Sequence, residues 1–367
     1  MIAIVGTDGS TDCTGTLVGP HTVLTAAHCQ IGPDNYASYR VFFGADVAGD
    51  GTSIDLSDAR VHPQFDPTTF AHDLALLTIA QAGPAQPIPI DPRVPDGSLV
   101  DQSFRAVGFG MTAAGAGDEG RKRVGTAAVS AVGDLDFTTK ASPSQPCVGD
   151  SGGPALFDVQ GATYITGVVS HGDTNCTDHA VYARIDVGLD TFVEPYLAET
   201  APGTAKPGDR CLYAEQCTGS TCVGAADDSR IMYCAPSCGG GASCPAGMVC
   251  TSVDGGGQQC RYPLPTPGAM GAPCASDGDC RFGVCTEKSV CSQRCMPAGD
   301  DCPAGFACTN LSGIEFYCMA VPAPEPGETS SCSLSSVPVP RGELAYALVV
   351  YGAVAGLLAV RRPRRRG

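Results

Sequence analysis

The sequence predicts an all-β amino-terminal half, a disulfide-rich region after it, and a single transmembrane helix near the carboxyl end. Three observations carry this prediction. The first 200 residues contain short β-rich runs, sixteen of the 21 Cys lie between Cys211 and Cys318, and 17 uncharged, mostly apolar residues precede a terminal Arg cluster. A chain of 367 residues is long enough for two or three domains, at least one of them with a full-sized core.

The amino-terminal domain, residues 1–200, is predicted from runs rich in β-branched and aromatic residues. Each run is short and is bounded by Gly, Pro or Asp, the residue types that interrupt strands. The clearest runs are Val41–Phe43, Leu74–Ile79, Phe104–Val107, Ile165–Val169 and Val181–Ile185.

Two Cys-rich repeats follow, at residues 208–262 and 271–321, with linkers at 201–207 and 263–270. Each repeat has eight Cys in a similar spacing, and the phrase Cys-Pro-Ala-Gly occurs once in each, at Cys244 and at Cys302. Their apolar side chains are too few for a core, so disulfides must supply most of the stability. Zinc is the weaker alternative because the cluster holds no His and no C-x2-C pair. Eight Cys allow 105 pairings, which the spacing does not decide.

The carboxyl end comprises a Pro- and Ser-rich linker at residues 322–343 and a membrane segment with a basic tail at 344–367. As a helix, Leu344–Val360 would span about 25 Å, slightly less than a bilayer core of about 30 Å. The five Arg that follow would stay cytoplasmic, which places the rest of the chain outside. A buried core helix is the alternative, but it explains neither the terminal position nor the Arg run.

This end resembles the three-part sorting signals of myxobacterial surface proteins, which combine a short Cys motif, one membrane helix and a terminal Arg cluster. The matching parts here are Ser331-Cys332-Ser333, Leu344–Val360 and the five Arg, although Ser331 stands where the motif usually has Gly. The resemblance implies that sorting machinery acts on this end and that Cys332, the odd cysteine, carries the anchor.

Composition narrows the function class and the compartment. A net charge of −16 argues against nucleic acid as a partner, because nucleic-acid binding needs a basic face. The density of Cys indicates an oxidising, exported location at the cell surface or beyond it. Since Met1-Ile2-Ala3 is no signal peptide, we expect the export signal to lie upstream of this start, or the sequence to be a fragment.

Three motifs in the amino-terminal domain carry chemistry. They are Thr25-Ala26-Ala27-His28-Cys29, then His72-Asp73-Leu74-Ala75-Leu76-Leu77, then Gly149-Asp150-Ser151-Gly152-Gly153-Pro154. A Ser hydroxyl needs a neighbouring base to act as a nucleophile, and His has an unperturbed pKa of about 6.5, near operating pH. A buried carboxylate can orient the His, and Gly lets backbone N–H groups face a developing oxyanion. Singly, the His and Asp motifs are more often structural, but the three together predict a nucleophilic site.

The order His28, Asp73, Ser151 resembles that of the trypsin/chymotrypsin family of serine proteases, over about residues 4–197. The resemblance implies two packed antiparallel six-stranded β-barrels with the site between them. It implies His28 as general base, Asp73 as its orienting partner, Ser151 as nucleophile, and the N–H groups of Gly149 and Ser151 as oxyanion hole. It implies a peptide or protein substrate and no metal or other cofactor; the family's calcium loop is not evident near residues 46–58.

Further roles come from the same resemblance. Cys13–Cys29 and Cys147–Cys176 are implied disulfides. Ile4-Val5-Gly6-Thr7 resembles the amino terminus that zymogen cleavage exposes, so an activating protease is expected to cut after Ala3 and to free an Ile4 ammonium that pairs with Asp150. The alternative is that Ile4 belongs to a plain edge strand.

Substrate recognition is assigned by the same comparison. Ser170-His171-Gly172 resembles the strand that pairs with substrate backbone, although the family usually has an aromatic residue at the position of His171. Gln145 stands where trypsin-like members have the Asp that binds Lys or Arg, and Gly172 and Ala180 line the same pocket. We therefore expect a neutral, small to medium side chain before the cleaved bond, without strong preference for Lys or Arg.

Two functions from different classes follow from these residues. The first is a surface-anchored or secreted serine endopeptidase. The second is a catalytically silent, protease-like scaffold that acts in binding or adhesion. The Cys-rich repeats serve as a stalk or as a binding module, and the sequence leaves both open.

Overall fold

The computed structural model describes residues 1–321 except 142, 230, 254–255, 282–283, 297–301 and 312–314. Met1–Val321 form one compact unit. Within this described part, no helix is long and apolar enough to cross a membrane. The predicted membrane segment Leu344–Val360, the Arg cluster and the proposed anchor Cys332 all lie outside the described residues.

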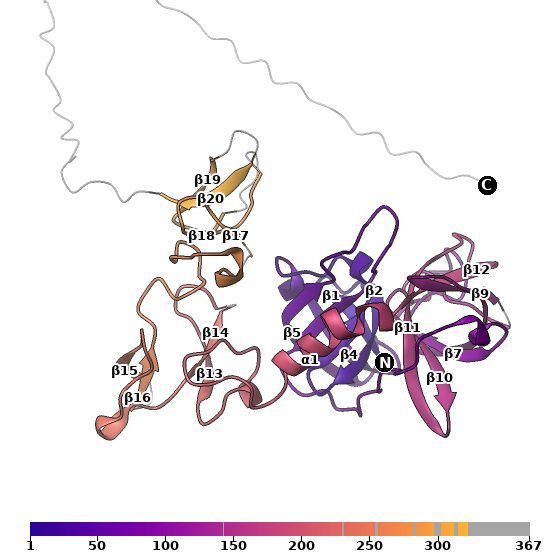
Figure 1. Ribbon diagram of the computed structural model, residues 1–367, viewed down its shortest axis with the longest axis horizontal. Helices are drawn as coiled ribbons and strands as arrows, with labels where there is room; N and C mark the ends of the chain where they lie inside the picture. The colour runs from indigo at the N-terminus through magenta and orange to yellow at the C-terminus, as the bar shows by residue number, and fades with distance from the viewer. Residues whose placement is uncertain are drawn as a thin grey trace, which may run out of the picture. The chain divides into compact units, whose positions relative to one another are not determined.

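The first half of the amino-terminal domain is a closed antiparallel barrel of six strands (Figure 1). Strand order around the barrel is β1-β2-β3-β6-β5-β4. Alternating buried residues of these strands fill the interior, among them Ile4, Leu17, Val23 and Leu77. The strands are β1 (Ile2–Gly6), β2 (Thr11–Gly19), β3 (Thr22–Thr25), β4 (Tyr39–Gly44), β5 (Gly51–Val61) and β6 (Ala75–Ile79).

A second closed barrel follows, with strand order β10-β11-β12-β9-β8-β7. Four aromatic rings, those of Phe104, Phe137, Phe157 and Tyr182, lie at its centre and contact one another. The all-β prediction with two six-stranded barrels is therefore confirmed. The strands are β7 (Ser103–Gly108), β8 (Arg123–Val132), β9 (Asp136–Ala141), β10 (Pro154–Val159), β11 (Ala162–Gly172) and β12 (His179–Arg184).

A separate apolar cluster joins the two barrels. It brings Leu24 and Leu76 of the first barrel against Leu156 and Val168 of the second, and it includes Tyr196. Tyr196 belongs to α1 (Glu194–Glu199), which continues a π-helical turn at Leu189–Val193, and its hydroxyl lies 2.5 Å from Thr78 Oγ1. Buried apolar contacts therefore hold the two barrels against each other.

The Cys-rich region consists of four small modules, two in each predicted repeat. Each module has four Cys paired first with third and second with fourth, and each carries a two-stranded hairpin. In every hairpin two Cys face each other across the strands, and each is bonded to a Cys that precedes the hairpin. The strands are β13 (Thr221–Gly224), β14 (Met232–Ala235), β15 (Val249–Val253), β16 (Gly257–Arg261), β17 (Val284–Cys285), β18 (Cys291–Ser292), β19 (Phe306–Asn310) and β20 (Phe316–Ala320).

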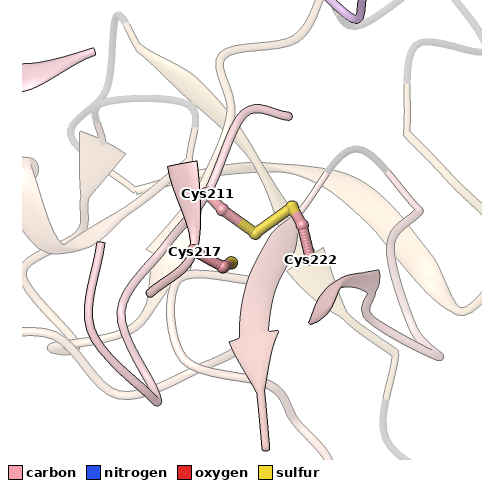
Figure 2. Close-up of side chains that lie close together, drawn as sticks. All are labelled: Cys211, Cys217 and Cys222. Atoms are coloured by element: carbon pink, nitrogen blue, oxygen red, sulfur yellow. A yellow bond between two sulfur atoms is a disulfide. The ribbon is translucent and has the colours of Figure 1, made fainter. Parts of the chain in front are cut away.

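The structure shows how the Cys of the two repeats pair, which their spacing does not decide. The pairs are Cys211–Cys222, Cys217–Cys234, Cys238–Cys250, Cys244–Cys260, Cys274–Cys285, Cys280–Cys291, Cys295–Cys308 and Cys302–Cys318. Three sulfur atoms of each module lie within 4.8 Å of one another. Figure 2 draws the three side chains of the first module, those of Cys211, Cys217 and Cys222. Each of these sulfurs is already bonded to another sulfur, so none is a thiolate that could ligate zinc.

The inter-barrel core predicts a specific stability loss. Leu76 is fully buried in this core, so Leu76→Ala should lower the free energy of unfolding by about 2–5 kcal/mol through lost burial and a residual cavity. The control is Val124→Ala on β8, where the side chain is 67% exposed and the change should stay within about 0.5 kcal/mol. Denaturant unfolding of the oxidised chain measures both, and equal losses in the two variants would contradict the assignment.

Candidate active site

His28 lies where the first barrel faces the second. The fully buried strand β3 ends at Thr25, and a 3-10 turn at Ala27–Cys29 turns the chain so that His28 stays partly exposed. Gln30 then adopts a left-handed conformation with φ 58° that ends the turn. The Cys13–Cys29 disulfide joins this turn to β2, so the His28 backbone is held on both sides.

Asp73 is a fully buried carboxylate that receives hydrogen bonds from both barrels. Its Oδ1 accepts the backbone N–H of His28 at 2.8 Å, and its Oδ2 accepts from His28 Nδ1 at 2.7 Å and from the Ser170 hydroxyl at 2.5 Å. A carboxylate can only accept here, so the proton of neutral His28 sits on Nδ1 and leaves Nε2 as an acceptor. Three bonds offset the cost of burying the charge of Asp73.

Ser151 lies on a tight turn that packs directly against the His28 segment. Thr14 donates its N–H to the carbonyl of Ser151 at 2.8 Å. Gly152 has φ 78°, and a Cβ there would come within 2.0 Å of Thr25 Oγ1, so this position requires Gly. In the described part of the chain, no hydrogen bond joins the Ser151 hydroxyl to His28. A long approach of this kind is common in sites without substrate.

Two backbone N–H groups in the Ser151 turn, those of Gly149 and Ser151 itself, have no backbone acceptor among the described residues. Over the described residues, no backbone carbonyl accepts the N–H groups of Gly149 and Ser151, whereas the neighbouring Asp150, Gly152 and Gly153 all donate to one. Gly149 has φ 94°, and a Cβ at this position would lie 2.9 Å from Gly110 Cα. The turn thus has two N–H groups, one residue apart, that are available to an oxyanion.

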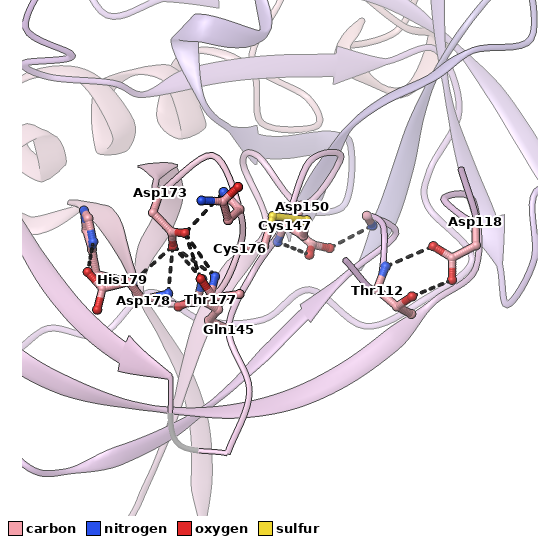
Figure 3. The surroundings of a disulfide bond; sticks show 12 residues. Thr112, Asp118, Gln145, Cys147, Asp150, Asp173, Cys176, Thr177, Asp178 and His179 are labelled. Atoms are coloured by element: carbon pink, nitrogen blue, oxygen red, sulfur yellow. Dashed lines mark hydrogen bonds and ion pairs between the residues drawn. A yellow bond between two sulfur atoms is a disulfide. The ribbon is translucent and has the colours of Figure 1, made fainter. Parts of the chain in front are cut away.

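The side chain of Asp150 turns inward and braces this turn. Its carboxylate accepts the N–H groups of Gly110 at 2.8 Å and Cys147 at 2.9 Å (Figure 3). Burial raises the pKa of Asp150, and the two N–H groups and the charge of Arg123 oppose that rise. A cavity of about 190 Å³ adjoins this carboxylate and is also lined by Gln145 and Gly110.

The structure does not bring Ile4 to Asp150. Ile4 is fully buried in β1, where it pairs with Cys13 of β2 and with Val41 of β4. The bond before Ile4 therefore lies inside a strand that is hydrogen-bonded on both sides. The expectation that Ile4 becomes a free amino terminus is wrong for this fold, and so is the alternative of an edge strand. Ile2–Val5 is an uninterrupted apolar run, which fits an interior strand equally well.

Of the residues assigned to substrate recognition, Gln145 lies beside the Cys147–Cys176 disulfide (Figure 3). Gln145 donates from its amide nitrogen to Asp173 Oδ1 at 2.9 Å, and its buried carbonyl oxygen has no partner among the described residues. Backbone N–H groups, that of Asp178 foremost, and the Gln145 amide lower the pKa of Asp173. Gly172 pairs with Ala180 across β11 and β12.

Sequence reasoning missed two contributions to this site. Ser170, expected to pair with substrate backbone, is 4% exposed and directs its hydroxyl to Asp73. Phe70 stands three residues before Asp73 with φ 58°, and its ring centroid lies 5.6 Å from that of His28 and 5.0 Å from that of His171. No pattern in the sequence marks either contact, because both depend on how separate loops meet.

Comparison with known proteins agrees with this architecture. A sequence model of the family described as Trypsin matches residues 1–191. The chain belongs to the trypsin family. This trypsin-family chain is 27% identical over 213 residues to a trypsin of Saccharopolyspora erythraea, covering 53% of the chain and 90% of that protein. It is 30% identical over 255 residues to serine protease 56 of Mus musculus, covering 57% of the chain and 41% of that protein.

One further relative is described differently. Glucanase inhibitor protein 1 of Phytophthora sojae is 27% identical over 202 residues, which cover 50% of this trypsin-family chain and 77% of that protein. Similarity of this degree therefore extends to a protein named for inhibition rather than for proteolysis.

Two stacked imidazole rings, those of His62 and His72, lie next to Asp73 and predict that the folded state is less stable at acid pH. His62 and His72 lie with ring centroids 4.8 Å apart, and the N–H of Gln64 donates to His62 Nδ1 at 3.2 Å. Burial lowers the pKa of His62, and the neighbouring His72 adds to this. The unfolded chain takes up a proton near pH 6.5 that the folded chain excludes, so this contribution to stability is present above that pH and is lost as pH falls.

The measurement is the melting temperature of the chain and of His62→Gln between pH 8 and pH 5. The difference in melting temperature between the parent chain and His62→Gln should be constant above pH 7.5. It should become steadily smaller below about pH 6.5. A difference that stays constant across the whole range would contradict the role of His62.

Proposed function

We propose that this trypsin-family chain is an exported serine endopeptidase that cleaves peptide bonds through His28, Asp73 and Ser151. The observation that carries the proposal is the buried Asp73 carboxylate, which holds the His28 ring by Nδ1 while Ser151 lies on a turn packed against the same segment. Support also comes from the unclaimed N–H groups of Gly149 and Ser151 beside the nucleophile.

The proposed reaction proceeds in two halves. His28 Nε2 takes the proton of the Ser151 hydroxyl as Oγ attacks the substrate carbonyl carbon. The carbonyl oxygen becomes an oxyanion that accepts from the N–H groups of Gly149 and Ser151. Collapse breaks the C–N bond, His28 returns its proton to the leaving amine, and an acyl-enzyme remains. Water, deprotonated by His28, then attacks this ester and regenerates Ser151.

Asp150 is proposed to order the oxyanion turn with the help of a cation. Its carboxylate already fixes two backbone N–H groups, and a positively charged group in the adjoining cavity would offset the cost of its burial. An activating protease stays among the proposed partners, but the bond before Ile4 is not its target because that bond is buried in β1.

For specificity we propose a neutral side chain before the cleaved bond. Gln145 brings no charge, and the carboxylate of Asp173 is already occupied by the Gln145 amide and by several backbone N–H groups. A Lys or Arg side chain would find no free carboxylate there. Gly172 and Ala180 are kept as wall residues of this pocket.

The remaining proposals concern location. Ten disulfides in the described part of the chain favour folding in an oxidising compartment, hence export. Surface anchoring through Cys332 and Leu344–Val360, and recognition by sorting machinery, stay proposals that rest on the sequence alone. In this arrangement the repeats at 208–262 and 271–321 act as a spacer or as a binding module.

A silent scaffold is the second candidate. The relative that is named for inhibition favours it. Labelling of the full oxidised chain with a fluorophosphonate separates the two functions, because only an activated Ser reacts. We expect labelling and peptidase activity in the chain, and loss of both in Ser151→Ala, with kcat falling by a factor on the order of 10⁶.

Absence of labelling in a folded, disulfide-bonded sample would contradict the endopeptidase and favour the scaffold. Activity that persists in Ser151→Ala would contradict the assigned nucleophile. Peptide libraries then test the neutral preference at the residue before the cleaved bond.

Ser170 supplies a finer test of the Asp73 arrangement. Ser170→Ala removes one bond to the carboxylate and keeps both bonds to His28, so kcat should fall about tenfold with KM nearly unchanged. The matched control is Ser130→Ala, whose exposed hydroxyl bonds only to the carbonyl of Thr138, and which should leave kcat unaltered. An unchanged kcat in Ser170→Ala would show that this hydroxyl does not position Asp73.

A further inference from the structure

A cavity of about 580 Å³ lies away from the candidate active site, where the outer face of the first barrel and α1 meet the Cys-rich modules. Its lining includes Asp58 and Arg60 of β5, Glu199 of α1, and Arg210 and Arg281 of the Cys-rich region. The volume far exceeds that of one water molecule, and the walls carry several charged groups. A cavity of this kind is suited to a polar ligand.

Arg281 is the most buried cation of this cavity. Its side chain is 9% exposed, and its Nη2 is buried without a hydrogen-bond partner among the described residues. Its Cζ lies 4.9 Å from the ring centroid of Tyr36, and its Nη1 lies 3.5 Å from Asp58 Oδ1. The guanidinium is therefore fixed in place while one of its nitrogens still lacks an acceptor.

Arg210 is a second guanidinium with no closed ion pair. Among the residues that the structure describes, none forms a hydrogen bond or a salt bridge with its side chain. Burial lowers the pKa of Arg210, and the like charge of Arg281 adds to this. Its Nη2 lies against Gly268, where a Cβ would come within 2.2 Å, and the carbonyl of Gly268 accepts the backbone N–H of Arg281. The exposed guanidinium of Arg210 and the buried one of Arg281 thus belong to segments that both contact Gly268.

The lining of the cavity carries four carboxylates and three guanidinium groups, but only one of the carboxylates forms an ion pair with Arg281. Glu199 is bound by both terminal nitrogens of Arg60, at 2.9 and 3.1 Å. Asp209 and Asp277 accept backbone N–H groups of Lys206 and Cys285. Asp58 alone is left to pair with Arg281, and burial raises the pKa of Asp58 although Arg281 and Arg60 oppose that rise. Over the described residues, Asp58 is therefore the only carboxylate in ion-pair contact with either Arg281 or Arg210.

We propose that this cavity binds a small tetrahedral oxyanion, phosphate or sulfate, between Arg210 and Arg281. Guanidinium groups match such an anion because each can offer paired N–H donors. The anion would supply the acceptor that Arg281 Nη2 lacks. It would also connect the first barrel to the Cys-rich modules, since Asp58 and Tyr36 hold Arg281 from the barrel side. This site is independent of the proposed peptidase activity.

The test is binding of sodium phosphate and sodium sulfate to the full oxidised chain, by calorimetry and by melting temperature, at ionic strength matched with sodium chloride. We expect both anions to bind and to raise the melting temperature above the chloride baseline. Arg210→Gln and Arg281→Gln should each weaken binding at least about tenfold. The matched control is Arg105→Gln in the second barrel, an exposed partner of Asp158, which should bind as the parent does.

Asp58→Asn should change the affinity for the anion in the opposite direction to the two Arg substitutions. Removing the competing carboxylate leaves Arg281 fully to the anion, so this variant should bind phosphate and sulfate more tightly than the parent. The variant keeps the proposal testable if the Arg281 substitution prevents folding. Binding of neither anion, binding of acetate alone, or equal binding in the parent and the Arg210 variant would overturn the proposal. Because fluorophosphonate labelling is a separate readout, failure here leaves the peptidase proposal untouched.

Discussion

The burial of one carboxylate, that of Asp73, is the constraint on which the site depends. Asp73 leads into a strand of the first barrel, yet one of its three hydrogen bonds comes from Ser170 on β11 of the second barrel. A buried charge is tolerated only when it is fully hydrogen-bonded. The two barrels must therefore keep one relative orientation for the fold to be stable. The inter-barrel core around Leu76 and Leu156 maintains that relative orientation. The hydrogen bonds of Asp73 thus contribute both to the stability of the fold and to the orientation of the His28 ring.

The turn that carries Ser151 is also held by contacts from several segments. Gly149 and Gly152 occur where positive φ and close packing exclude a side chain, and the carboxylate of Asp150 fixes the loop from behind. Thr14 binds this turn through its backbone and also through its hydroxyl, which donates to the carbonyl of Gly149. The turn therefore rests on β2, the strand that the Cys13–Cys29 disulfide joins to His28.

Much of this could be predicted from the sequence, because the three motifs carry residue types that the chemistry requires in a fixed order. The barrels, the triad candidates and the two disulfides of the amino-terminal half follow from that resemblance. Ile4 could not be placed, since an apolar run fits a barrel strand as well as a freed terminus. The connection of Ser170 to Asp73 joins positions 97 residues apart. The pairing of the repeat Cys depends on hairpins whose strands are too short to read from periodicity.

The local pairing of the Cys has a mechanical consequence. Every disulfide in the described residues closes a loop within one module or within the amino-terminal domain, and none links that domain to the Cys-rich region. Only the single backbone through residues 201–210 joins them covalently. One cut there would free the amino-terminal domain from the modules as soon as their non-covalent contacts separate, with every cross-link intact on both sides. The lifetime of the joined form would then be set by contacts such as the stacking of His21 on Tyr213.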